Sequence, residues 1–334
     1  MFIGSFEYLT MRGNMVENLR ELITASRRLS WTHFGKRITF YAPSFAYYKN
    51  VHASTLPLTF PSISITGRGC ALKCKHCNGK VLHTMIPATT PQELLAVCRR
   101  VKETGGQGCL ISGGCLSNGS VPIKNFIGTI QQIKQDLALT LVVHTGVVDK
   151  EIAAELAGAG VDAVLLDIIG SQETIEDIYN LQLAVDDYET SLQVLSEAGL
   201  PFVPHVLVGL HYGRLLGEIN ALEMIAKHQP QGVVIIALTP LKGTAMEDIL
   251  PPSAEDIAWV LAKARILMPQ TPLSLGCMRP KGSHRKKTDV LAVQTGVNAI
   301  AFPEEAAIAL AESIGLEIQF STTCCSQIYE DLKR

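Results

Sequence analysis

The chain has 334 residues, of which 47% are hydrophobic and 18% charged, and its formal net charge is −2. This composition is typical of a well-packed enzyme rather than of a disordered or fibrous chain. A net charge so close to zero argues against nucleic acid as a partner. The sequence shows no apolar run long enough to span a bilayer and no signal peptide, so we expect no membrane association. Nine cysteines in such a chain predict a reducing, cytoplasmic location.

An N-terminal arm with one helix over residues 15–28 is expected to precede a regular α/β pattern. From residue 61 onward, short β-branched runs alternate with longer amphipathic stretches such as 90–103 and 253–266. Continuous apolar runs suit a parallel sheet that is buried on both faces. The eight predicted strands are 62–66, 109–112, 140–144, 163–167, 202–208, 233–238, 273–276 and 298–301.

Eight strand and helix units close most simply into a complete (β/α)8 TIM-type barrel. An open six-unit barrel with a separate C-terminal piece is the alternative. We expect an arm over 1–60, a barrel over 61–315 and a tail over 316–334 that carries Cys324 and Cys325 across the barrel mouth. In such barrels the active site lies at the carboxyl ends of the strands.

Cys70, Cys74 and Cys77 follow the first predicted strand with the spacing C-x3-C-x2-C. Three thiolates so close together can hold three irons of a cubane 4Fe–4S cluster and leave the fourth iron free to bind a ligand. A structural zinc site that adds His76 or His83 is less favoured, because such sites usually pair two short cysteine clusters. A disulfide would leave one of the three thiols over.

This spacing resembles the signature of the radical S-adenosylmethionine (SAM) superfamily. The resemblance implies that SAM binds the open iron and is cleaved to a 5′-deoxyadenosyl radical, which abstracts hydrogen from an unactivated C–H bond. It also implies SAM contacts near the ends of strands, although Cys115 stands where the family usually has an acid. The expected SAM-binding residues are His76, Ser112, Gly113, Gly114, Gly209 and Thr239.

Further polar side chains lie at strand ends, where they can face a substrate. His144, Asp167 and His205 are candidate catalytic residues on this ground. The alternative is that they only satisfy buried polar groups at the barrel rim. Cys277 and Arg279, which follow the seventh predicted strand, are candidates for the same reason.

A second group of cysteines is predicted to hold an auxiliary 4Fe–4S cluster. Cys277, Cys324 and Cys325 would meet at the barrel mouth, and Cys115 could join them from the second strand. The fourth ligand stays open between Cys115, Ser326 and the substrate. Packing in the core is the alternative for any buried cysteine, and it is the interpretation for Cys98 and Cys109.

Together with 240–244 and 276–280, these motifs resemble biotin-synthase-like radical SAM proteins, and most closely a component of the archaeal-type two-protein lipoyl synthase. That resemblance implies sulfur insertion at C6 or C8 of an octanoyl chain on a lipoyl carrier protein, with the auxiliary cluster as sulfur donor. It also implies a second radical SAM subunit and an electron donor such as ferredoxin or flavodoxin.

Two other functions compete with this hypothesis. A radical SAM maturase or mutase would act on a small molecule without inserting sulfur. A zinc-stabilised barrel would perform no radical chemistry at all. The basic segment 279–287 is either a docking surface for an acidic carrier or an ordinary solvated loop and helix start.

Overall fold

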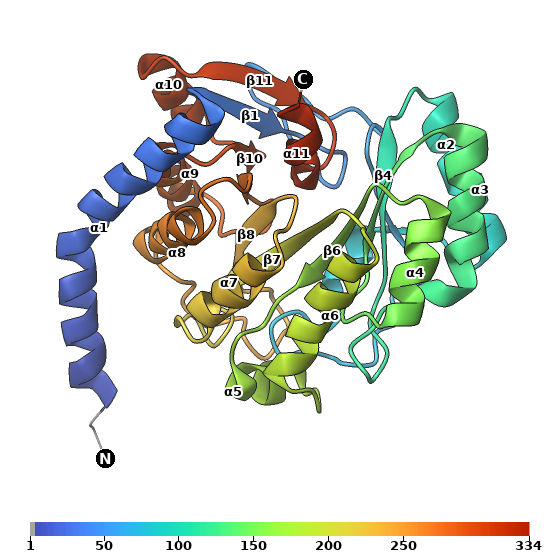
Figure 1. Ribbon diagram of the computed structural model, residues 1–334, viewed down its shortest axis with the longest axis horizontal. Coiled ribbons are helices and arrows are strands. Elements are labelled where there is room, and N and C mark those ends of the chain that lie inside the picture. Colours follow the sequence, from blue (N-terminus) through green and yellow to red (C-terminus); the bar gives the residue numbers. More distant parts are fainter. Residues whose placement is uncertain (1–3, 334) are drawn as a thin grey trace.

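The computed structural model describes residues 4–333, with side chains from Leu19 onward. Its core is one parallel sheet whose strands follow the order β11-β1-β10-β9-β8-β7-β6-β5-β4-β2-β3. The sheet curls, and helices cover its outer face (Figure 1). The strands are β1 (Arg37–Tyr41), β2 (Ser62–Ser64), β3 (Ile86–Pro87), β4 (Gly108–Ser112), β5 (Thr140–His144), β6 (Ala163–Asp167), β7 (Phe202–Val208), β8 (Val233–Ala237), β9 (Leu273–Leu275), β10 (Ala299–Ala301) and β11 (Glu317–Ser321).

The helices follow the strands in the alternation that the sequence predicts. Thr90 and Ser253 begin two of them with capping boxes, which satisfy free backbone N–H groups at the helix start. The helices are α1 (Gly4–Phe34), α2 (Pro91–Glu103), α3 (Ile127–Leu137), α4 (Lys150–Ala159), α5 (Gln172–Thr174), α6 (Val185–Glu197), α7 (Glu218–Lys227), α8 (Ala254–Leu267), α9 (Ser283–Thr295), α10 (Glu305–Ser313) and α11 (Ile328–Asp331).

The predicted α/β fold of TIM type is confirmed, but the sheet is a curled, open half-barrel. The eight predicted strands correspond to β2 and to β4 through β10. Within residues 4–333, β11 and β3 are the two edges of the sheet, and they do not pair with each other. The sheet is therefore open, and the prediction of a complete, closed barrel is corrected.

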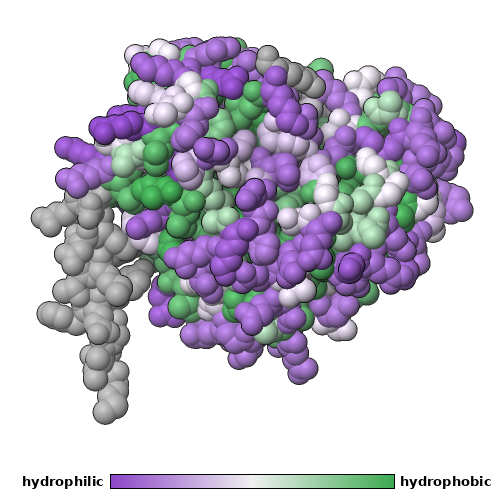
Figure 2. All heavy atoms as spheres, viewed as in Figure 1, coloured by the Kyte–Doolittle hydropathy of each residue, from purple (hydrophilic) through white to green (hydrophobic). Residues whose placement is uncertain are grey.

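Three strands were not predicted: the two-residue edge strand β3, and β1 and β11, which tie both ends of the chain into the sheet. Strand β1 pairs in parallel with β10 on one side and β11 on the other. Helix α1, much longer than expected, packs on α8 through Leu19 and Ile23. A hydrophobic area beside α1 is visible in Figure 2, on a face that is otherwise largely hydrophilic. The predicted arm and tail thus both contribute strands to the one sheet.

Alternation along the strands creates an outer and an inner core. Side chains such as Val143 and Ile235 pack under the helices, whereas Val142, Leu165 and Val203 point to the concave side. Figure 1 shows α11 on this concave side. The inner core consists of these inward side chains and of C-terminal residues that include Cys324, Cys325 and Ile328.

The C-terminal segment inserts into the half-barrel, which corrects its predicted place across the mouth. The Ser274 hydroxyl of β9 donates to the carbonyl of Cys325 at 3.2 Å. Further along, the Tyr329 hydroxyl donates to the carbonyl of Asp162, just before β6, at 2.5 Å. The segment therefore runs from the carboxyl ends of the strands toward their amino ends. No helix in the described part of the chain is long and apolar enough to cross a bilayer.

Candidate functional site

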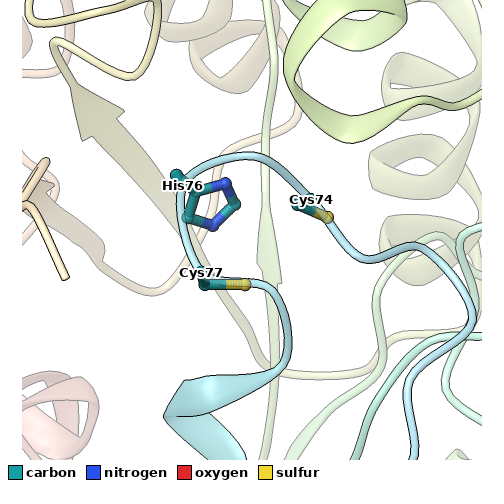
Figure 3. A group of neighbouring side chains, drawn as sticks. All are labelled: Cys74, His76 and Cys77. Atoms are coloured by element: carbon teal, nitrogen blue, oxygen red, sulfur yellow. The ribbon is translucent and has the colours of Figure 1, made fainter. Parts of the chain in front are cut away.

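The first cysteine motif lies in the loop after β2 and gathers three potential ligands. The sulfurs of Cys74 and Cys77 and a ring nitrogen of His76 all lie within 4.8 Å of one another (Figure 3). Cys70 is half-buried at the start of the same loop, outside this tight group. The imidazole of His76 also packs edge-on against Tyr179, with ring centroids 5.3 Å apart.

A hydrogen bond couples two thiols of this loop. Hydrogen bonding with the Cys74 thiol lowers the pKa of Cys77, and the same contact raises that of Cys74. The Nδ1 atom of His76 is buried without a hydrogen-bond partner among the described residues. Because thiolates are the ligands of iron–sulfur clusters, the donor set fits the predicted cluster.

The motif loop is anchored on the end of β4. The hydroxyl of Thr66 donates to the Gly69 carbonyl at 2.8 Å and accepts from the Gly114 N–H at 2.7 Å. A Cβ on Gly114 would lie 2.0 Å from the Gly69 oxygen and 2.6 Å from the Cys70 Cβ. Gly114 therefore permits the cysteine loop to pack on the strand end. Its predicted contact with SAM, like that of Gly113, stays a prediction.

The other predicted SAM-binding residues also lie at the carboxyl ends of strands. The Ser112 hydroxyl donates to the carbonyl of His144 at 3.3 Å. Gly209 has φ 72°, and its N–H donates to the buried Glu218 carboxylate at 2.8 Å. Thr239 is half-buried just after β8. These placements agree with a site at the carboxyl ends of the strands. The hydrogen bonds of Ser112 and Gly209 also give these two residues a role within the fold.

His144, Asp167 and His205 are brought together as one cluster on the concave face. Their donor atoms lie within 4.8 Å of one another, and His144 Nε2 is 3.7 Å from Asp167 Oδ1. Burial lowers the pKa of His205 to about 4, so its imidazole is neutral at pH 7. Burial alone would raise the pKa of Asp167, but hydrogen bonding to His144 and the nearby imidazoles lower it.

The residues of the second cysteine group lie just after β9 and at the start of the inserted segment. Cys324 and Cys325 are buried and Cys277 is half-buried, all in the inner core. Burial and the nearby Cys324 raise the pKa of Cys277 to about 11. Hydrogen bonding with Cys325 lowers the pKa of Cys324, and the charge of His144 acts in the same direction. Among the described residues, these three sulfurs do not form a group whose atoms all lie within 4.8 Å of one another, so their sharing of one cluster stays a prediction.

Cys115 does not belong to this second group. Its carbonyl accepts a hydrogen bond from the N–H of Ala71, in the first motif loop, at 2.8 Å. Burial raises the pKa of its thiol to about 12, with further contributions from Cys70, Asp167 and Cys77. The structure therefore places Cys115 beside the first motif, which corrects its predicted part in an auxiliary cluster.

Arg279 is a structural residue, which corrects its predicted catalytic role. It is 1% exposed. Its guanidinium binds Asp289 in a two-pronged ion pair at 2.7 and 2.8 Å and donates to the Gly276 carbonyl at 2.6 Å. It also donates to the carbonyl of Phe302 at 3.3 Å. These contacts fix the turn that carries Cys277, and they leave the guanidinium no access to a substrate.

The residues that contact Lys75 of the first motif from other loops were not predicted from the sequence. The ammonium of Lys75 contacts the Asp177 carboxylate at 2.6 Å and the Tyr212 hydroxyl at 2.9 Å. With Tyr179, these partners come from the segments after β6 and β7. Their spacing in the sequence holds no signal, because only the curling of the sheet brings those segments to the motif.

A family model described as the radical SAM superfamily matches residues 64–213. That range begins in β2 and includes all three cysteines of the first motif as well as His144, Asp167 and His205. The chain carries a radical SAM domain. A 4Fe–4S cluster and SAM are accordingly its implied cofactors, and the donor set around Cys77 fits such a cluster.

Curated relatives of this chain include biotin synthases. Biotin synthase of Prochlorococcus marinus (strain MIT 9215) is 26% identical over 253 residues, which cover 72% of this chain and 73% of that protein. Biotin synthase of Novosphingobium aromaticivorans is also 26% identical, over 250 residues that cover 71% of this chain and 69% of that protein. This radical SAM enzyme is therefore related to biotin synthases at low identity.

Solved structures share the fold of this radical SAM chain. Methylornithine synthase matches with a TM-score of 0.62 and 14% identity, covering 95% of this chain and 92% of that one. The FeFe-hydrogenase maturase HydG from Carboxydothermus hydrogenoformans matches with a TM-score of 0.61 and 15% identity, over 92% of this chain and 73% of that one. At such identities the likeness supports the architecture alone.

Proposed function

We propose that this radical SAM enzyme inserts sulfur and acts as a component of a two-protein lipoyl synthase. The proposed substrate is an octanoyl chain on a lipoyl carrier protein, with sulfur added at C6 or C8. A second radical SAM subunit and an electron donor such as ferredoxin or flavodoxin would complete the reaction. The proposed sulfur source is an auxiliary 4Fe–4S cluster held by Cys277, Cys324 and Cys325.

The observation that carries this proposal is the second cysteine group. A radical SAM enzyme that only rearranges a carbon skeleton has no use for three more cysteines beside its site. Cys324 and Cys325 reach the end of β9 only because the C-terminal segment inserts into the half-barrel. The shared place of Cys277, Cys324 and Cys325 in the inner core supports a second thiol-rich site on the concave face that carries His144.

The residues of the chain have distinct parts in the proposed reaction. When bound, the first cluster and SAM supply a radical able to remove hydrogen from an unactivated C–H bond. Cys70, Cys74 and Cys77 would hold that cluster, while Lys75 and its partner Asp177 fix the loop around it. The apolar inner core, with side chains such as Val142 and Leu165, excludes water from the neighbourhood of the second group.

Iron and acid-labile sulfide counts test the second cluster. The protein is purified and reconstituted without oxygen, as wild type and as the triple variant Cys277→Ser, Cys324→Ser, Cys325→Ser. We expect about eight irons and eight sulfides per wild-type chain and about four of each in the variant. The variant should still cleave SAM to 5′-deoxyadenosine, which shows that its first site is intact.

The matched control replaces two cysteines that lie in the outer core. Cys98 and Cys109 are fully buried, with their sulfurs 3.8 Å apart. The variant Cys98→Ala, Cys109→Ala should keep the wild-type iron count. About four irons in both the wild type and the triple variant would refute the sulfur donor and favour a maturase or mutase. Zinc without sulfide would instead indicate a scaffold without radical chemistry.

A second experiment tests the substrate. The reconstituted enzyme is incubated with SAM, a reductant and an octanoylated carrier protein, with and without a companion subunit, and the carrier is analysed by mass spectrometry. Sulfur on the octanoyl chain is the expected result. For carrier docking, the exposed Lys281 and Lys286 are the available basic side chains, because Arg279 is buried against Asp289 and Lys287 pairs with Glu255.

A further inference from the structure

Three neighbouring strands place His144, Asp167 and His205 on one surface. Asp167 of β6 is the register partner of His205 of β7, and His144 of β5 is the partner of Leu165, two residues before Asp167. Because side chains alternate along a strand, all three share the concave face with Leu165. This histidine–aspartate cluster occupies the carboxyl end of that face, above the apolar inner core.

The cluster lacks the partners that a purely structural role would require. No lysine or arginine among residues 19–333 forms an ion pair with the half-buried Asp167 carboxylate; its one such contact is with His144 at 3.7 Å. The Nδ1 atom of His205 is buried and has no hydrogen-bond partner in the described part of the chain. Unpaired polar groups of this kind are costly unless a ligand satisfies them.

We propose that His144, Asp167 and His205 bind a single divalent transition-metal cation, at a site separate from both cysteine groups. Two imidazoles and one carboxylate suit Zn²⁺ or Fe²⁺. Around such an ion, ligand atoms about 2.1 Å from the metal lie roughly 3 to 3.5 Å apart. The 3.7 Å separation of His144 Nε2 and Asp167 Oδ1 needs only a small side-chain movement to reach that range.

The donor set indicates what this ion would do. Three protein ligands leave coordination positions open, as in catalytic rather than structural metal sites. An oxygen atom of a substrate, from a carbonyl or carboxylate group, is the ligand that would fill them. The ion would then orient the substrate on the concave face, between the first motif and Cys324. This role does not depend on sulfur insertion and goes beyond the proposed function.

Zinc binding to the cluster-loaded protein tests the site directly. The reconstituted protein is dialysed anaerobically against EDTA and then against a low concentration of Zn²⁺, and zinc, iron and sulfide are counted for each sample. We expect about one zinc per wild-type chain and under about a fifth of that in His144→Ala and in His205→Gln. Iron and sulfide should not change in these variants.

Two further variants make the test specific. Asp167→Asn keeps the size of the side chain but removes its charge, and it should weaken zinc binding at least tenfold. His83→Ala removes an exposed histidine beside the first motif and should bind zinc as the wild type does. The proposal is overturned if the wild type binds no zinc or if the His144 and His205 variants retain it. It is equally overturned if these variants lose iron and sulfide, since the histidines would then belong to a cluster.

Discussion

Arg279 illustrates how a residue beside a functional site can act through the fold. The sequence placed it two residues after Cys277, which suggested catalysis, but its guanidinium is fully occupied by Asp289 and two carbonyl groups. Removing it would leave the buried carboxylate of Asp289, which is 0% exposed, without a counter-charge.

We therefore predict that Arg279→Met lowers the free energy of unfolding by about 3–5 kcal/mol, measured by urea denaturation. The control, Lys124→Met, breaks an ion pair with Glu151 in which both side chains are more than half exposed, so stability should hardly change. A stable Arg279→Met protein with lost turnover would restore the catalytic role that the structure disfavours.

Gly114 provides a second prediction, because its hydrogen atom faces the cysteine loop. In Gly114→Ala, the new Cβ would overlap the Gly69 carbonyl and Cys70, so the loop must move off the end of β4. We expect the iron count to fall by about four per chain, with the circular dichroism spectrum retained. Gly128→Ala, whose Cβ would meet no atom within 4 Å, is the control and should keep its iron. Unchanged iron in Gly114→Ala would show that the loop adapts.

At the residue scale, candidate site residues were easier to predict from the sequence than the groups in which they lie together. Spacing alone identified Cys70, Cys74 and Cys77, since all three lie in one loop. The grouping of His144, Asp167 and His205 depends on strand register, which no short motif encodes. The sequence assigned Cys115 to the second cysteine group, but it lies beside the first. Loops that follow different strands all emerge at the carboxyl ends of the sheet, so the sequence alone does not show which loops are in contact.

At the scale of elements, the inserted C-terminal segment is the main departure from expectation. Ile328 is 0% exposed in the inner core, among side chains of the half-barrel. We predict that Ile328→Ala lowers the free energy of unfolding by about 2–5 kcal/mol, because it creates a cavity in that core. A segment that merely lay across the mouth would tolerate the change. Leu250→Ala, at a side chain that is 83% exposed, should have little effect.

Strands β1 and β11, which were not predicted, carry a recognisable pattern in the sequence. In β11, Ile318 and Phe320 alternate with polar residues, which is the pattern of a strand with one apolar face, although Ile318 is only half-buried and Phe320 is 42% exposed. The run that became β1 is almost wholly buried and contains Ile38 and Phe40. Both lie within the segments that were predicted as an arm and a tail, and they form strands through long-range pairing between the two ends of the chain.

At the scale of the whole molecule, the open sheet and the inserted segment together create the site. The sheet ends at β3 and β11 and does not close into a barrel. Residues after β11 fill its concave side. The first motif stands near the β2 and β4 end of the sheet, while Cys277 follows β9 on the other side. The histidine–aspartate cluster lies on β5, β6 and β7, between them in the strand order.

The proposed function requires two separate groups of cysteines to hold two iron–sulfur clusters. It is tested most directly in the variant Cys70→Ala, Cys74→Ala, Cys77→Ala, which leaves only the second group intact. After anaerobic reconstitution, iron and sulfide analysis should find about four of each per chain, with no cleavage of SAM. Fewer than about one iron per chain in this variant, with its fold intact by circular dichroism, would contradict the account.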